Sequence, residues 1–283
     1  MNTSSSIADL LITRQSTPTP IAFVPTMGAL HEGHLSLFRK ARQAIGPNGQ
    51  VFVSIFVNPL QFDRPTDLTN YPRTLTEDLQ KCQNEGVNHV FLPKATEFYA
   101  SDHSIQVIEN KLAHHLCGAS RPGHFDGVCT VVLKLFNLLT PTVAVFGKKD
   151  YQQLAIIRRL VRDLALSVEI IAAETHREED GLAMSSRNLN LTPPDRRDSA
   201  RLRKALLAAQ NLAVTGERNP ERYLTTAHQQ LQNPPKSFKL DYLDLVSRET
   251  LQPLSSVSEP ALLAIAAFYQ NVRLIDNIEI DTA

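Results

Sequence analysis

The chain has 283 residues, which is enough for one large domain or two ordinary ones and for a sizeable hydrophobic core. Its 29 Lys and Arg residues balance its 29 Asp and Glu residues, which argues against a surface that binds nucleic acid non-specifically, because such a surface leaves a basic excess. An apolar content of 42% with 20% charged residues excludes an intrinsically disordered chain.

The first 175 residues alternate short apolar runs with amphipathic segments. The runs predict strands at residues 21–24, 51–57, 89–92, 142–147 and 168–174, and the segments predict helices at 34–45, 74–85, 128–139 and from Asp150 onward. Short strands that are apolar throughout are typical of a parallel sheet with helices on both faces. We therefore expect an α/β fold with a Rossmann-like domain over residues 1–175.

Residues 176–283 have a different composition, since ten of the 11 glycines lie at or before Gly181. The stretch 195–231 is rich in Ala, Leu, Arg and Gln and predicts two helices that are broken near residues 216–220. Strand-like runs follow at 238–246, 261–268 and 271–280. We expect these residues to form a smaller α+β domain that acts as a lid.

Three cysteines, an odd number without a C-x-x-C pair, argue against a disulfide framework and a zinc knuckle. The N-terminal residues lack the basic and apolar regions of a signal peptide, and no run approaches the roughly 18 apolar residues of a membrane span. We therefore expect a cytoplasmic protein that does not enter the membrane.

The strongest motif is PTMGALHEGH, residues 25–34, which follows the first predicted strand. His31 and His34 stand at the start of a helix and project toward one side, where both can face an anion that the first-turn amides also attract. Gly33 leaves the backbone open to a phosphate or a ribose. Imidazole N–H donors placed here suit charge that develops on a nucleotide phosphate. An equal alternative is two polar residues at a helix entrance, whereas zinc binding lacks a third ligand within reach.

Lys149 follows the predicted strand that ends at Gly147, at the sheet edge where parallel α/β folds bind ligands. Asp150 can cap the next helix and Gln153 occupies the capping-box position, which is a sufficient structural explanation for both. A functional interpretation keeps these caps and adds Lys149 as a cation that contacts phosphate. Gln61 follows another strand at the same edge, and its carboxamide can donate to and accept from a substrate with hydroxyls and a carboxylate.

The segment GLAMSSRN, residues 181–188, offers two hydroxyls and an arginine in a flexible loop that can close on a polyphosphate through hydrogen bonds and charge. Such a combination is common in loops, so alone it is a weak signal. The preceding HREED, residues 176–180, is interpreted as a solvated charged stretch rather than a metal site.

Together these segments resemble one family, the pantothenate synthetases or pantoate–β-alanine ligases. The similar segments run in order along nearly the whole chain: PTMGALHEGHLSL, VSIFVNPLQF, DLTNYPRTLTED, RPGHFDGVCTVVLKLFN, GKKDYQQL, DGLAMSSRN and RLIDNIEI. By this resemblance HEGH is the HIGH-type signature of the nucleotidylyltransferase superfamily, and MSSRN is the counterpart of its second, mobile loop.

The resemblance implies a reaction in two steps. The carboxylate of pantoate attacks the α-phosphate of ATP to give an enzyme-bound pantoyl adenylate and pyrophosphate, and the amine of β-alanine then attacks the acyl carbon to give pantothenate and AMP. Family members use Mg²⁺, which ATP largely holds, so no protein residue is expected as a metal ligand. They are usually homodimers.

The resemblance also implies roles for individual residues. Gln61 and Gln153 bind pantoate, and Gln61 also lies near β-alanine. Family members commonly have an acidic or amide residue where this chain has Lys148, and we expect Lys149 to contact the phosphate. The expected catalytic residues are His31, His34, Lys149 and Arg187. The expected ATP contacts are Met27, Gly28, Ala29, Leu30, His31, Glu32, Gly33, His34, Gly147, Lys148, Lys149, Asp150, His176, Met184, Ser185, Ser186 and Arg187.

Two other functions fit parts of the pattern. Enzymes of a neighbouring class carry the same signatures and transfer a nucleotidyl group to a phosphorylated acceptor or to an amino acid. Gln61 and Gln153 instead favour a pocket for a small hydroxy acid. A nucleotide-sensing or RNA-binding module on this fold would lack catalytic residues or carry a basic face, whereas the four expected catalytic residues are present and the net charge is zero.

Overall fold

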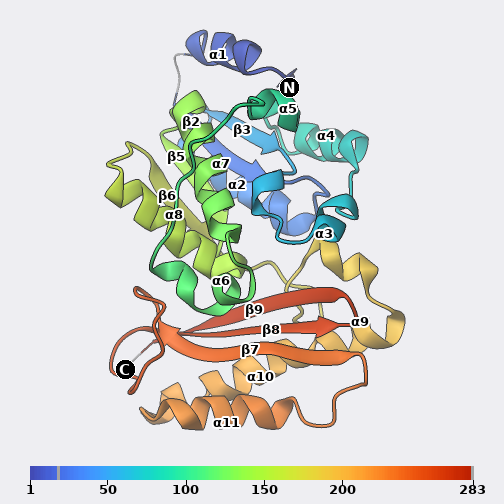
Figure 1. Ribbon diagram of the computed structural model, residues 1–283, viewed down its shortest axis with the longest axis vertical. Coiled ribbons are helices and arrows are strands. Elements are labelled where there is room, and N and C mark those ends of the chain that lie inside the picture. Colours follow the sequence, from blue (N-terminus) through green and yellow to red (C-terminus); the bar gives the residue numbers. More distant parts are fainter. Residues whose placement is uncertain (18–19, 282–283) are drawn as a thin grey trace. The chain divides into compact units, whose positions relative to one another are not determined.

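In a computed structural model, which describes residues 1–17 and 20–281, the chain forms two compact units (Figure 1). The first unit comprises Met1–Glu109, Arg121–Lys148 and Ile156–Glu174, and the second comprises Asn110–Ser120, Lys149–Ala155 and the chain from Thr175 on. The domain boundary expected at residue 175 stays a prediction. None of the helices in the described residues combines the length and hydropathy of a membrane-spanning segment.

The first unit is built on a parallel sheet in which six strands of the described chain follow the order β1-β4-β3-β2-β5-β6. The strands are β1 (Asn2–Ser4), β2 (Ile21–Thr26), β3 (Gln50–Ile55), β4 (His89–Phe91), β5 (Val143–Gly147) and β6 (Glu169–Ala173). The last five lie where apolar runs predict strands, so the expected parallel α/β fold is confirmed. The polar strand β1 is not predicted by hydrophobicity, and it pairs with β4 in a register that places Asn2 beside His89.

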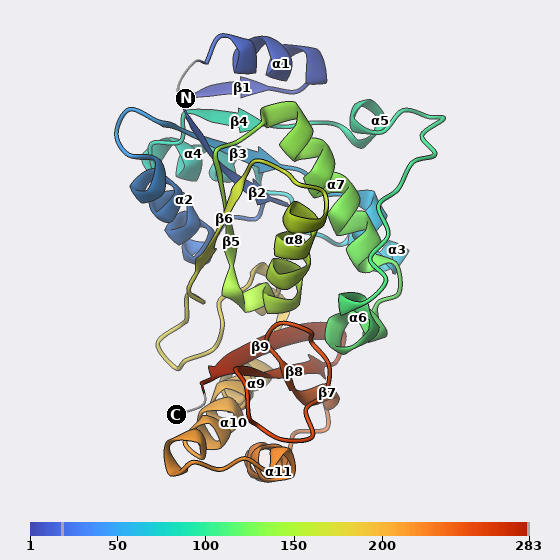
Figure 2. The same cartoon turned by 90° about the vertical axis from the view of Figure 1, so that its left-hand side faces the viewer.

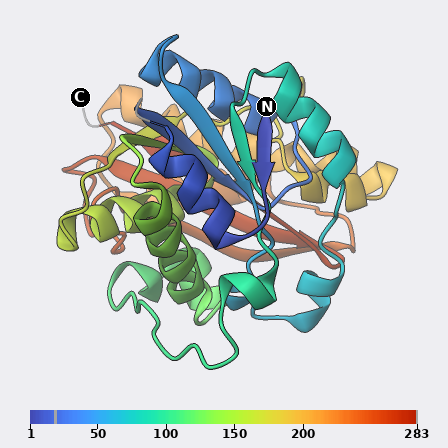
Figure 3. The same cartoon turned by 90° about the horizontal axis from the view of Figure 1, so that it is seen from above.

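Helices cover both faces of this sheet (Figures 2 and 3). The helices of this unit are α1 (Ile7–Gln15), α2 (Glu32–Ile45), α3 (Pro65–Thr69), α4 (Leu75–Asn84), α5 (Ala95–Phe98), α7 (His124–Leu139) and α8 (Tyr151–Asp163), the last of which begins in the second unit. Val24 of β2 shares a core cluster with Phe38 of α2 and Cys82 of α4. The neighbouring Phe23 contacts Phe136 of α7, with ring centroids 6.4 Å apart. Because adjacent residues of one strand are buried on opposite faces, its sequence is apolar throughout.

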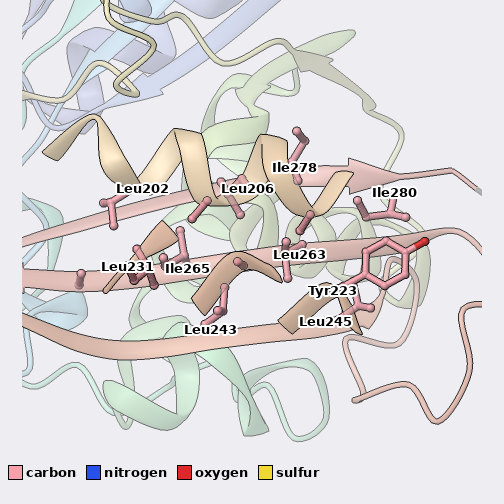
Figure 4. Packing of buried hydrophobic residues seen from close by; sticks show 14 of the residues in the cluster. Leu202, Leu206, Tyr223, Leu231, Leu243, Leu245, Leu263, Ile265, Ile278 and Ile280 are labelled. Atoms are coloured by element: carbon pink, nitrogen blue, oxygen red, sulfur yellow. The ribbon is translucent and has the colours of Figure 1, made fainter. Parts of the chain in front are cut away.

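The second unit contains an antiparallel sheet formed by β7 (Phe238–Ser247), β8 (Ala261–Tyr269) and β9 (Val272–Ile280), in that order. Its helices are α6 (Leu116–Ser120), α9 (Pro193–Ser199), α10 (Arg201–Gln210) and α11 (Pro220–Gln230). Leucines of α10 and Tyr223 of α11 pack against residues of the strands (Figure 4). The expected smaller α+β fold is therefore confirmed, while its action as a lid stays a prediction.

The number of helices predicted between residues 195 and 231 is wrong, because the structure has α9 and α10 where one helix is expected. The Ser199 hydroxyl donates to the Arg196 carbonyl over 2.8 Å, an interaction that bends helices, and the chain turns at Ala200. The predicted break near residues 216–220 is confirmed, since Gly216 has a φ of 72° and α11 begins at Pro220.

Candidate active site

The turn between β2 and α2 carries the first residues of the predicted ATP site. Gly28 and Ala29 have left-handed backbone conformations, with φ of 83° and 49°, and a Cβ at Gly28 would be crowded by a side-chain atom at 3.0 Å. The turn is tied to α4, because the Ala29 amide donates to Asp78 Oδ2 over 2.9 Å and Lys81 Nζ donates to the Leu30 carbonyl over 2.6 Å. The helix thus fixes the backbone that leads to the two histidines.

The structure brings His31 and His34 together at the start of α2, as predicted. Their ring centroids are 4.1 Å apart, and the His31 amide donates to His34 Nδ1 over 3.3 Å. Glu32 lies between them in sequence, but its carboxylate accepts a charge-assisted hydrogen bond from Arg39, further along α2. The imidazoles therefore form a close pair, and the intervening carboxylate is engaged with a cation.

Gln61 lies in the 3₁₀ turn Pro59–Gln61, directly after β3, and its side chain is held at both ends. Asn58 Nδ2 donates to Gln61 Oε1 over 3.0 Å, and Gln61 Nε2 lies 3.2 Å from Met27 Sδ. Asn58 is itself oriented by Tyr99, whose hydroxyl donates to Asn58 Oδ1 over 2.9 Å. Two segments that sequence analysis assigns to ATP and to pantoate thus meet at Met27 and Gln61.

The shape of this 3₁₀ turn depends on α7. Gly127 packs against it so closely that an added Cβ would lie 2.3 Å from the Leu60 carbonyl oxygen. His124 Nδ1 lies 2.7 Å from the Gln61 carbonyl oxygen, to which Arg121 also donates over 3.2 Å. The segment RPGHFDG, to which sequence analysis gives no role, therefore positions the backbone of Gln61.

Arg121 also makes an ion pair with Asp63, with Nε and Oδ1 2.9 Å apart. Partial burial opposes ionisation of this carboxyl, but the hydrogen bond and charge of Arg121 outweigh it and keep the pKa of Asp63 below its ordinary value. The pair is thus charged at neutral pH and braces the chain that follows Gln61.

The two neighbouring lysines after β5 have different surroundings. Lys148 Nζ lies 2.6 Å from the carboxylate of Glu174 in the first unit, whereas Lys149 Nζ lies 3.6 Å from Asp150 in the second. The Lys149 carbonyl accepts a hydrogen bond of 2.9 Å from Asn277 Nδ2. Asp150 is the last residue before α8, the position from which a residue caps a helix.

The adjacent glutamines at the start of α8 also differ. Gln152 is buried, and its Nε2 donates to the carbonyls of Leu112 and His115 over 2.7 and 2.8 Å. Gln153 is only half-buried. Gln152 thus has a structural role that sequence analysis does not identify, and its neighbour is the residue expected to bind pantoate.

The segment expected to be a flexible loop forms a 3₁₀ turn, Ser186–Asn190, within the second unit. Ser185 caps this turn, since its hydroxyl accepts from the Arg187 amide over 3.3 Å, and the Met184 amide donates to the His176 carbonyl over 3.0 Å. Asn188 Nδ2 donates to Glu178 over 2.6 Å. These contacts give the predicted phosphate-binding side chains a defined backbone.

Residues 176–180 are expected to be a solvated charged stretch, and Glu179 and Asp180 are indeed exposed, whereas Glu178 is half-buried. Glu178 and Asp180 both pair with Arg196 of α9, and this partner keeps the pKa of Asp180 below its ordinary value. Within residues 1–17 and 20–281, no three His, Cys, Asp or Glu side chains gather as metal ligands would.

Comparison with known proteins identifies relatives along the whole chain. The family model described as pantoate-beta-alanine ligase matches residues 1–279. A pantothenate synthetase from Akkermansia muciniphila is 50% identical over 260 residues, which are 92% of each chain. Another from Pseudothermotoga lettingae is 49% identical over 257 residues, covering 91% of this chain and 90% of the relative.

Solved structures of similar proteins share the fold. Pantothenate synthetase from Thermus thermophilus has a TM-score of 0.93 at 44% identity, covering 99% of this chain and 100% of its own. The pantoate-beta-alanine ligase from Francisella tularensis, solved as a complex with beta-gamma ATP and beta-alanine, has a TM-score of 0.81 at 35% identity, covering 100% of this chain and 99% of its own.

Proposed function

The chain belongs to the pantoate–β-alanine ligase family. We propose that the paired histidines His31 and His34 and the turn that carries Gln61 take part in the two steps of the ligase reaction. The enzyme condenses (R)-pantoate with β-alanine at the expense of ATP and releases pantothenate, AMP and pyrophosphate. The observation that carries this assignment is the family match over residues 1–279, to which the close pair His31 and His34 adds the expected chemical groups.

In the proposed first step, the carboxylate of pantoate attacks the α-phosphate of ATP and pyrophosphate leaves, which gives a pantoyl adenylate. Pantoate is already ionised at neutral pH, so this attack needs no base. The chain must instead stabilise the negative charge that develops on the phosphoryl oxygens. We assign this to the imidazole N–H groups of His31 and His34 and to the cations of Lys149 and Arg187.

The nucleotide is proposed to contact the turn 27–30, the start of α2, residues 147–150 and the segment 184–187, together with His176. The bare backbone at Gly147 and the left-handed turn at Gly28 support this assignment. The ion pair between Lys148 and Glu174 supports Lys149 as the main phosphate contact. We further propose that residues 176–283 act as a lid, since they carry the segment 184–187.

Pantoate is proposed to bind through the carboxamides of Gln61 and Gln153, and β-alanine through Gln61. An amide group can accept from a substrate hydroxyl and donate to a carboxylate at the same time. Support comes from the fixed orientation of Gln61, whose Oε1 accepts from Asn58. In the second step the neutral amine of β-alanine attacks the acyl carbon of the adenylate, the amide bond forms as the acyl–phosphate bond breaks, AMP leaves, and one proton of the amine is released.

Mg²⁺ is proposed to enter with ATP. The side chains assigned to the phosphate charge are imidazole, ammonium and guanidinium donors, which suit phosphate oxygens. The neighbouring carboxylates are engaged by the chain itself, since Glu32 accepts from Arg39, Asp150 lies 3.6 Å from Lys149 Nζ, and Asp78 accepts from backbone amides. Such a donor set fits a cation held by the phosphates themselves, whose charge the cation neutralises. The chain's own residues would then orient the phosphates rather than ligate the metal.

We propose that the enzyme is a homodimer and that its first unit supplies an exposed apolar contact. Ile105 and Ile108 are 83% and 64% exposed, although both are large and apolar. Their segment is fixed to α7, because the amides of Val107 and Glu109 donate to Thr130 and Asp126, each over 2.9 Å. A second copy of the chain would cover this fixed apolar segment.

A cytoplasmic location is proposed from the cysteines. Cys82, Cys117 and Cys129 are all free and buried, and burial raises the pKa of Cys82 and of Cys129 to about 12. Thiols of this kind are suited to a reducing compartment.

The decisive experiment supplies ATP, Mg²⁺, pantoate and β-alanine to the purified protein and follows AMP and pyrophosphate. Stoichiometric AMP, pyrophosphate and pantothenate are expected, and omission of β-alanine should leave a single turnover of pyrophosphate from the bound adenylate. AMP formed without pantoate would favour transfer to a different acceptor. Absence of AMP with all substrates present would overturn the assignment.

A further inference from the structure

The strand β9 carries two adjacent polar residues, Asp276 and Asn277, that are buried among the apolar residues of the strand. They belong to the motif RLIDNIEI, which the proposed reaction leaves without a role. Buried polar groups require partners, and in both cases the partner lies in a segment that we assign to the nucleotide or directly beside one.

Asn277 is bound to Lys149. Its Nδ2 donates to the Lys149 carbonyl oxygen over 2.9 Å, between residues 128 positions apart in the chain. Because the bond engages the backbone carbonyl, it fixes the point from which the lysine side chain extends without involving its ammonium group, which lies beside Asp150. Both residues lie in the second unit, as do all the contacts below.

Asp276 is bound to the base of the 181–188 segment. Its carboxylate accepts two hydrogen bonds from Arg177, over 2.8 and 3.0 Å, and Arg177 Nη1 also donates to the Gly181 carbonyl over 3.0 Å. Gly181 has a φ of 91°, so the chain turns sharply at the point that Arg177 holds. The backbone amide of Asn277 donates to Asp276 Oδ1 over 2.7 Å, so the residue that binds Lys149 and the residue that binds Arg177 are also bonded to each other.

Successive side chains of a strand point to opposite faces. Leu274, Ile278 and Ile280 of β9 belong to the core cluster that packs against α10 and α11, and Asp276 has the same parity. Asn277 has the opposite parity. One dipeptide therefore reaches Lys149 from one face of the sheet and Arg177 from the other.

We infer that Asp276 and Asn277 are positioning residues that hold Lys149 and the base of the segment carrying Arg187 on one rigid strand. Two cations that must meet the same polyphosphate gain from a common support, because the cost of ordering them is met during folding and not during the reaction. This inference rests on the proposed phosphate-binding roles of Lys149 and Arg187. The new element is that β9 sets the relative position of Lys149 and of the segment that carries Arg187.

The test measures the rate of pyrophosphate release in the single turnover without β-alanine, at saturating ATP and over a range of pantoate concentrations, in a double-mutant cycle. Asn277→Ala should lower this rate by about 10- to 100-fold, the range expected for a small misplacement of a reacting group, and should leave the KM for pantoate unchanged. In a Lys149→Ala background the same substitution should have no further effect, because Asn277 acts through Lys149. Asp276→Asn should lower the rate as well. In an Arg187→Ala background the Asp276→Asn substitution should have no further effect, because Asp276 acts through the segment that carries Arg187.

Gln210→Ala is the matched control. Gln210 Nε2 donates to the Glu279 carbonyl over 2.9 Å, so this variant also removes an amide-to-carbonyl bond at β9, but one that touches neither nucleotide segment. It should keep the wild-type rate, and the melting temperatures of the Asn277 and Gln210 variants should be similar.

Three outcomes would overturn the inference: a wild-type rate in Asn277→Ala, a wild-type rate in Lys149→Ala, or effects of the two that multiply in the double variant. Multiplying effects would mean that Asn277 has a general structural role and does not act through Lys149. A wild-type protein that makes no AMP from pantoate would instead overturn the proposed function, so the two failures are distinct.

Discussion

The Leu30 amide donates to Asp78 Oδ1 over 2.7 Å, which ties the turn before the paired histidines to the first turn of α4. The other carboxylate oxygen accepts from the Ala29 amide. Asp78 is 1% exposed, so both bonds are buried and neither amide has water as an alternative partner. A single carboxylate thus satisfies two successive backbone donors in a left-handed turn.

Asp78→Asn should destabilise the protein and slow adenylate formation. An asparagine offers one acceptor oxygen, and its amino group would face the second backbone amide, donor against donor. We expect a loss of about 1.5–3 kcal/mol in the free energy of unfolding, measured with urea. The exposed Asp102 is the control, and Asp102→Asn should be neutral. Equal stability of both variants would mean that Asp78 does not hold the turn.

His34→Ala should lower the rate of pyrophosphate release by roughly 100- to 1,000-fold, because one donor to the developing phosphate charge is lost. The side chain is half-buried at the start of α2, so the fold should persist, which circular dichroism would verify. His228→Ala, at an exposed position of α11, should retain the wild-type rate. Unchanged kinetics in His34→Ala would remove the charge-stabilising role.

Gly147 provides a test of the bare backbone at the end of β5. Its φ lies outside the left-handed region, and the nearest atom to an added Cβ is Leu37 Cδ2 at 3.9 Å, so Gly147→Ala should leave the free energy of unfolding unchanged. If ATP approaches this backbone, the methyl group should raise the KM for ATP about tenfold, equivalent to about 1.4 kcal/mol of binding.

Gly127→Ala is the comparison for this substitution. Its Cβ would collide with the Leu60 carbonyl in the protein itself, so it should cost about 1–3 kcal/mol of stability and raise the KM for pantoate through Gln61. A Gly147→Ala variant with an unchanged KM for ATP would place the nucleotide elsewhere.

The fold was predictable where one strand carries its own signal. Phe23 and Val24 are apolar because each faces a different helix layer, and that pattern is visible within a few residues. The strand Asn2–Ser4 has no such signal, since its pairing depends on His89, whose Nε2 lies 2.8 Å from Ser4 Oγ. A contact over 85 positions leaves no local pattern.

The site was predictable to the same extent. His31 and His34 are three residues apart, so one helical turn brings them together whatever the remaining chain does. Asp78 is one of several acidic residues on an amphipathic helix, and only the folded chain brings it to the amides of the turn. Positioning residues of this kind act through tertiary contacts, so a single sequence does not distinguish them from surface carboxylates.

His89 makes stability depend on pH. It is 2% exposed in β4, where its ring stacks on Phe52 at a centroid distance of 4.9 Å, and burial lowers its pKa below the ordinary value of 6.5. The unfolded chain therefore binds a proton, as pH falls through about 6.5, before the folded chain does. The contribution of His89 to the free energy of unfolding should be constant above that pH. Below that pH it should fall, by at most about 1.4 kcal/mol per pH unit.

His89→Gln should remove this part of the dependence, since a glutamine does not titrate in this range but can still bond to Ser4. Urea unfolding between about pH 7.5 and pH 5.5 measures the change for each protein, and the variant should lose less stability on acidification than the wild type. The exposed His228 serves as control, and His228→Gln should lose as much as the wild type. If the free energies of unfolding of the wild type and of His89→Gln fall in parallel as the pH is lowered, protonation of His89 does not cause the loss of stability.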